Sequence, residues 1–223
     1  MLNKKITMDM THGSLWNKIL MFALPLAASS ILQQLFNSVD TAVVGRFASS
    51  QALAAVGSNS SLISLMINLF IGISLGSNVV IAHYIGQKSE KNIHAAVHTA
   101  IVVAILSGVF VMILGQFIAK PVLLLMGTPE DVIDLAVLYL RIYLIGMPFI
   151  MLYDFGSSIL RSTGDSKRPL YSLIVAGIVN TVLNLILVIV FKLGVSGVAI
   201  ATVISNVVSS SIVMVSLCMN QSL

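Results

Sequence analysis

Six long apolar stretches dominate the sequence and restrict what the chain can fold into. They cover residues 15–44, 54–82, 95–119, 135–157, 170–191 and 197–219. A helix needs about 20 apolar residues to cross a bilayer, whereas a strand of a membrane β-barrel shows only about ten residues of alternating pattern. Only 9% of the 223 residues are charged, against roughly 25% in a soluble domain. The sequence therefore predicts an all-α integral membrane protein with six transmembrane helices.

The distribution of Lys and Arg predicts how these helices are oriented. A polar segment, residues 1–14, precedes the first stretch and contains Lys4 and Lys5. Eight of the twelve Lys and Arg residues lie on the side of this segment, three lie on the opposite side, and Arg141 falls within the fourth stretch. Loops rich in Lys and Arg stay in the cytoplasm. We therefore expect a multi-pass protein of the cell membrane with both termini in the cytoplasm.

The first stretch carries a polar stripe and two residues that are unusual in a membrane helix, Pro25 and Asp40. At about 100° per residue, one face of this helix collects Ser29, Ser30, Gln33, Gln34, Asn37, Asp40 and Thr41. A carboxylate at the centre of a bilayer costs about 2.5–3.5 kcal/mol, so its default interpretation is functional. The alternative is that Asp40 lies at the aqueous end of its helix and is merely solvated.

Polar residues gather on one face of three other stretches as well. In the second, fifth and sixth stretches these sets are, in turn, Ser61, Ser64, Asn68 and Gly72; Gly177, Asn180 and Asn184; and Thr202, Ser205, Asn206 and Ser209. Small and amide residues also join membrane helices by packing and hydrogen bonding, which is the simpler explanation for any one stripe. Four stripes and an intramembrane carboxylate in six helices together favour a shared, water-filled cavity.

Several classes of function are disfavoured by the sequence. It contains none of the short motifs of metalloproteases, serine hydrolases or nucleotide-binding enzymes, so we expect no enzymatic activity and no cofactor. His94 and His98 are spaced for one helix face, but no third ligand accompanies them, and no metal site is predicted. The net charge of +4 is small and scattered, which argues against a nucleic-acid partner.

Two further charged residues fall within the fourth stretch. Asp154 lies near its cytoplasmic end, where solvation is easy, and is the second candidate for a functional acid. Arg141 is expected to be buried, paired with a carbonyl, a carboxylate or a lipid phosphate.

Three segments of the chain, taken in order, match a known family. The first is LPLAASSILQQLFNSVDTAVVGRF (24–47), followed by LAAVG; the second is LRSTGDSKRPLYS (160–172); and the third is GVSGVAIATVISN (194–206). They resemble the first-helix region, the loop between helices four and five, and the start of helix six of the MATE (multidrug and toxic compound extrusion) transporters. The resemblance implies one six-helix lobe of a twelve-helix transporter whose two lobes surround a central cavity.

The resemblance also implies roles for individual residues. MATE transporters export cationic, amphipathic compounds in exchange for protons or sodium ions. By resemblance, Asp40 is the first-helix acid of cation coupling, Pro25 is the proline at which that helix bends, and Asn180 is a polar cavity residue. The polar stripes add further expected cavity or substrate residues, which are Gln33, Gln34, Asn37, Thr41, Asn68, Asn184, Thr202 and Asn206.

The sequence departs from the family pattern at two points. Some members carry a carboxylate one turn after the helix-five asparagine, where this chain has Asn184. Asp40 is therefore the only acid expected deep in the cavity. The chain also matches only the N-terminal lobe, so we expect a C-terminal half or a second copy to complete the cavity, with membrane lipids around it.

The predicted function is cation-coupled export of cationic, amphipathic compounds, with a proton or a sodium ion as the coupling ion. Two alternatives remain open. One is a flippase of lipid-linked oligosaccharides with a related fold, which would carry several cationic residues along its cavity; Arg141 is the one candidate here. The other is a membrane fragment that transports nothing.

Overall fold

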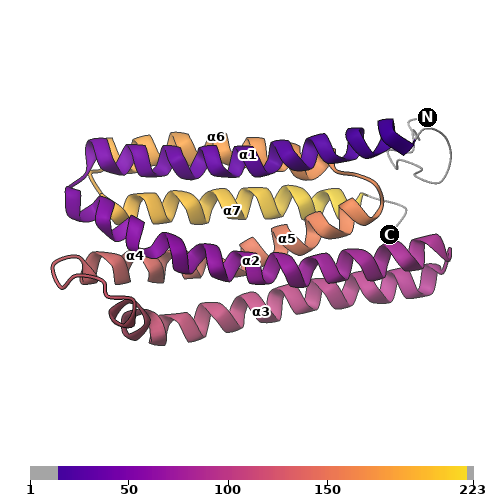
Figure 1. The fold of residues 1–223 in the computed structure, drawn as a ribbon, viewed down its shortest axis with the longest axis horizontal. Helices are drawn as coiled ribbons and strands as arrows, with labels where there is room; N and C mark the ends of the chain where they lie inside the picture. The colour runs from indigo at the N-terminus through magenta and orange to yellow at the C-terminus, as the bar shows by residue number, and fades with distance from the viewer. Residues whose placement is uncertain (1–14, 220–223) are drawn as a thin grey trace.

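A computed structural model describes residues 15–219 and shows a bundle of long helices (Figure 1). The helices are α1 (Leu15–Phe47), α2 (Ser50–Gly86), α3 (Glu90–Leu125), α4 (Ile133–Ile145), α5 (Met147–Ser162), α6 (Lys167–Leu185), the π-helix η1 (Ile186–Val190) and α7 (Val195–Cys218). No strand occurs among these residues. The predicted cytoplasmic segment 1–14 lies outside the described residues.

The helices provide up to six membrane spans. α1, α2, α3, α6 with η1, and α7 are each long and apolar enough to cross a bilayer. α4 and α5 pass the same test as a pair and are bent by 48° relative to one another. α1 begins and α7 ends at the same end of the bundle (Figure 1), as an even number of crossings requires. The prediction of an all-α membrane protein is confirmed.

The helices extend beyond the apolar stretches from which they were predicted. Between the predicted stretches 15–44 and 54–82, only Ala48 and Ser49 are not helical. The Ser49 hydroxyl accepts a hydrogen bond of 3.1 Å from the backbone N–H of Ala52 and so caps the start of α2. Polar residues can therefore continue a membrane helix into the interface.

The bend between α4 and α5 falls at Gly146, just before Pro148 in the first turn of α5. A proline is tolerated there because the N–H groups of a first turn have no partner within the helix. α3 approaches this point closely: a Cβ built on Gly108 would lie 2.5 Å from Pro148 Cα. Gly108 therefore allows α3 to pack directly against the bend.

The core of the bundle lies around α5 and α7. Met147, Met151, Phe155 and Ile159 follow one another at steps of four along α5, and all are almost completely buried. α5 packs against α2, α3 and α7, and α7 lies between the pair α1 and α6 and the elements α5 and α2 (Figure 1). α1 is the least enclosed span: only 6% of its most apolar window is buried, against 39% for α7. Its main neighbour is α6.

Arg141 does not lie inside the bundle, and the expectation that it is buried was wrong. Its side chain is exposed on α4, and its backbone carbonyl accepts a 2.9 Å hydrogen bond from Gln116 Nε2 of α3. Lys120, one turn beyond Gln116, pairs with Asp134 of α4 at 3.9 Å. The position of Arg141 along the sequence gave its approximate depth, but not which face of α4 carries it.

Candidate functional site

Asp40 lies inside the bundle, in the second half of α1. Its side chain is buried, with 8% relative exposure, and its Oδ1 accepts a hydrogen bond from Asn184 Nδ2 of α6. It is therefore not a solvated acid at the end of a helix. Asp40 therefore has both a position within a membrane-spanning helix, which made it a functional candidate, and a specific polar partner, Asn184.

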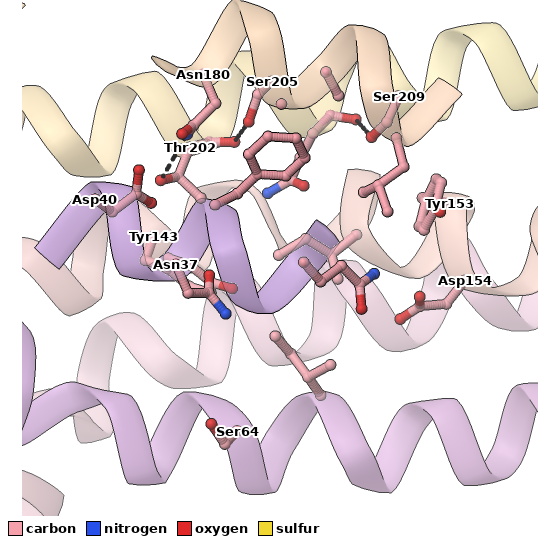
Figure 2. Close-up of a pocket in the computed structure, with 18 of the residues that line it drawn as sticks. Asn37, Asp40, Ser64, Tyr143, Tyr153, Asp154, Asn180, Thr202, Ser205 and Ser209 are labelled. Atoms are coloured by element: carbon pink, nitrogen blue, oxygen red, sulfur yellow. Dashed lines mark hydrogen bonds between the residues drawn. The ribbon is translucent and has the colours of Figure 1, made fainter. Parts of the chain in front are cut away.

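A chain of hydrogen bonds continues from this pair across α6 to α7. Asn184 Nδ2 also donates to Asn180 Oδ1 at 3.1 Å. Asn180 Nδ2 donates in turn to the Thr202 hydroxyl at 3.5 Å, as Figure 2 shows. Thr202 donates to the Val198 carbonyl of its own helix at 3.0 Å. The network links three helices, and it places the carboxylate among groups that either donate or accept hydrogen bonds.

A close approach of α1 and α6 positions Asp40 opposite Asn184. Gly177 lies two turns before Asn184, and a Cβ at Gly177 would collide with the ring of Phe36. Asp40 follows Phe36 by one turn on α1. Because residues four apart share a helix face, the seating of Phe36 on Gly177 brings the next turn of α1 against the amides of α6.

Two hollows meet at Asp40. The first has a volume of about 240 Å³ and is lined by residues of α1, α2, α4, α5, α6 and α7 (Figure 2). The second has a volume of about 630 Å³ and extends between α1 and α2 towards α4. Both are lined in part by Asn37, Asp40, Ser64, Tyr143 and Thr202. The carboxylate thus lies at the boundary between two accessible spaces.

The structure brings together almost all of the side chains predicted for the cavity. The first hollow is lined by Gln33, Asn37, Asp40, Asn68, Asn180, Thr202 and Asn206. Gln34 and Thr41 line the second. Asn184 lines neither hollow, because it is completely buried behind Asp40 and holds the carboxylate from that side. Helical periodicity was sufficient to find these faces.

Pro25 lies within α1, away from both hollows. Its missing N–H removes the helical hydrogen bond to the carbonyl of Met21. The carbonyl of Pro25 itself accepts a 2.8 Å hydrogen bond from the hydroxyl of Ser29. α1 runs through this position as a single helix, and the role of Pro25 as a hinge stays a prediction.

The expectation that Asp40 is the only acid in the cavity was wrong, because Asp154 lines the first hollow as well. Its Oδ2 is buried and has no hydrogen-bond partner in the described part of the chain. Tyr143 and Tyr153, which flank the bend between α4 and α5, also line this hollow. The sequence signal was the occurrence of three polar side chains in a short apolar stretch, but the bend between α4 and α5 was not predicted.

Comparison with known proteins identifies the family to which this chain belongs. A family model described as MatE matches residues 25–186. The chain belongs to the MatE family. A relative of this MatE chain, "Probable multidrug resistance protein YoeA" of Bacillus subtilis, is 38% identical over 214 residues, which are 94% of this chain and 46% of that protein.

Solved structures support the same relationship for this MatE chain. The crystal structure of MATE in the bent conformation superposes with a TM-score of 0.87 at 26% identity, covering 93% of this chain and 46% of that one. The crystal structure of MATE in the straight conformation gives a TM-score of 0.85 with the same identity and coverage. This MatE chain spans about half the length of the relatives it matches, as expected for one lobe. MatE transporters are membrane proteins, and the apolar helices described above fit that class.

Proposed function

We propose that this chain is one lobe of a transporter that exports cationic, amphipathic compounds in exchange for a proton or a sodium ion. The observation that carries the proposal is Asp40, a buried carboxylate at the junction of two hollows with an amide donor on one side. The likeness to multidrug resistance proteins agrees with such a role. The remaining half of the transporter, or a second copy of this chain, would complete the cavity in the cell membrane, with both termini of this lobe in the cytoplasm.

Binding of the coupling ion and binding of the substrate would both depend on the charge of Asp40. When Asp40 holds a proton or a sodium ion, the cavity contains no free carboxylate at this position. When the ion leaves, the charge is available to attract a cation, and Asn184 stabilises it by hydrogen bonding. Each ligand shifts the balance between two conformations only as far as its affinity differs between them. Pro25 gives α1 a place to bend between such conformations, and similarity to both bent and straight MATE structures supports this element of the proposal.

The composition of the hollows favours this function over a flippase of lipid-linked oligosaccharides. Such substrates carry phosphate groups, which cationic side chains bind. No Lys or Arg in the described part of the chain lines either hollow. The side chains present are carboxylates, amides, hydroxyls and apolar groups, a combination suited to an organic cation.

The test is proton release when a cationic substrate is added to the protein, purified in detergent as the assembly that it forms in membranes. We expect wild type to release protons and Asp40→Asn to release none, because the amide keeps the shape of the side chain but cannot titrate. Asp134→Asn is the matched control, since the Asp134 side chain is 92% exposed. If neither wild type nor control releases protons, repeating the binding titration with and without sodium decides whether sodium is the coupling ion. Equal proton release from wild type and Asp40→Asn would refute the role of Asp40.

A further inference from the structure

The first hollow contains a second carboxylate that the proposed exchange at Asp40 does not use. Asp154 comes from α5, whereas Asp40 comes from α1, and Figure 2 shows the two at opposite ends of the pocket. The two acids also differ in their partners. Asp40 accepts a hydrogen bond from Asn184, but the buried Oδ2 of Asp154 has no partner among the described residues.

The neighbours of Asp154 on its own helix do not satisfy this oxygen. Arg161, two turns further along α5, attracts Asp154 electrostatically. However, no salt bridge in the described part of the chain joins Arg161 to Asp154, whereas Lys120 pairs with Asp134 and Arg168 pairs with Asp165. Within the same range, the buried Ser157 hydroxyl and Arg161 Nε also lack hydrogen-bond partners. A buried acceptor without a donor is costly, and a charged one is costlier still. The Oδ2 atom of Asp154 is therefore a buried acceptor that no donor among the described residues satisfies, and Arg161 lies near it without pairing with it.

We propose that Asp154 is the carboxylate that binds the charged nitrogen of an amphipathic cationic substrate, while Asp40 binds the coupling ion; this inference rests on the proposed function. A cationic nitrogen that reaches Asp154 supplies both the missing hydrogen-bond donor and the opposite charge. The apolar body of the same molecule meets Phe36, Ile67 and Ile150, which line the hollow between the polar groups. Substrate and coupling ion then use separate carboxylates of one cavity, and the charge that the ion frees on Asp40 adds to the attraction for the cation bound at Asp154.

The probe is ethidium, a permanent cation with amine donors, compared with its neutral parent, the diaminophenylphenanthridine that lacks the quaternary ethyl group. Binding of each is measured by fluorescence titration of the purified assembly, at a pH where the parent is uncharged. We expect Asp154→Asn to weaken ethidium binding about 10- to 100-fold and to leave binding of the neutral parent unchanged. Asp134→Asn again serves as the charge-matched control.

A second readout separates the roles of the two acids. At saturating ethidium, Asp154→Asn should release as many protons as wild type, or show the same sodium dependence, whereas Asp40→Asn should bind ethidium and lose this response. Asp154→Glu keeps the charge and should retain the preference for ethidium over the neutral parent, so it provides the test if Asp154→Asn does not fold.

Three results would overturn the inference. The first is wild-type ethidium affinity in Asp154→Asn, which would leave export through Asp40 intact as a proposal. The second is an equal loss of affinity for both dyes, or no preference for ethidium in a folded Asp154→Glu variant, since either points to a structural role for the acid. The third is a wild-type protein that binds neither dye, which would overturn the proposed function together with this inference.

Discussion

At the scale of single residues, the position of Asp40 depends on a residue that has no side chain. Gly177 leaves room for the ring of Phe36, and this contact sets the distance between α1 and α6 one turn before Asp40 meets Asn184. The amide–carboxylate pair is therefore a consequence of packing as much as of its own hydrogen bond. A change at Gly177 should disturb the coupling site without touching any of its polar atoms.

We expect Gly177→Ala to lower the free energy of unfolding by about 1–3 kcal/mol, because the added methyl group overlaps the Phe36 ring. Thermal unfolding in detergent measures the effect, and Phe36→Leu in the same chain should recover part of it. Gly72→Ala is the control, since a Cβ there meets nothing within 4 Å. Equal melting temperatures for Gly177→Ala and Gly72→Ala would show that the approach of α1 to α6 is looser than described.

At the scale of elements, α1 is suited to movement. It is the least buried of the long helices, it packs mainly against α6, and Pro25 interrupts its hydrogen-bond ladder. Among the described residues, α1 makes few contacts with α7 and none with α5, the helices around which the core lies. A bend at Pro25 would therefore change the shape of the cavity without breaking the main packing of the lobe.

Pro25→Ala should restore a helical hydrogen bond and slow exchange, while equilibrium binding of substrate changes little. Substrate exchange in vesicles and dye binding in detergent measure the two effects separately. Pro121→Ala, a proline inside α3 that lines neither hollow, should leave both quantities near wild type. A Pro25→Ala protein that exchanges as fast as wild type would remove the hinge from the mechanism.

The elements also explain what sequence alone could and could not predict. Hydrophobic length was enough to predict six spans, and periodicity was enough to place Gln33, Asn180 and Thr202 on inward faces, because both properties are local. The fourth span is predicted as one stretch, residues 135–157, whereas the structure breaks it at Gly146 into α4 and α5. Asp154, in α5 after the break, lines the first hollow. The pairing of Asp40 with Asn184 could not be predicted from the sequence either, since it depends on which helices become neighbours.

At the scale of the whole molecule, the long helices of the described residues run between two opposite ends of the bundle (Figure 1). α1 begins and α7 ends at one of these ends (Figure 1), which the distribution of Lys and Arg predicts to be cytoplasmic. The same assignment puts the connection between α2 and α3 in the cytoplasm and the connection between α1 and α2 outside the cell.

In a Cys218→Ser background, we expect Lys91→Cys to react with a membrane-impermeant thiol reagent only from the cytoplasmic side. Gln51→Cys should react only from the outside. Gln51 lies in the first turn of α2, Lys91 lies in the first turn of α3, and both are exposed. Accessibility is measured by labelling intact cells and then opened cells. Labelling of Lys91→Cys in intact cells would reverse the orientation.

The distance between Asp40 and Asn184 along the chain has a consequence for biosynthesis. The two residues are 144 positions apart, so at about 5–20 residues per second the ribosome makes Asn184 roughly 7–30 s after Asp40. During that interval α1 is in the membrane, or waits beside it, with a carboxylate whose amide donor does not yet exist. Lipid offers no substitute for this donor. Insertion of α6 is therefore the step at which the first helix of the nascent chain acquires its polar partner.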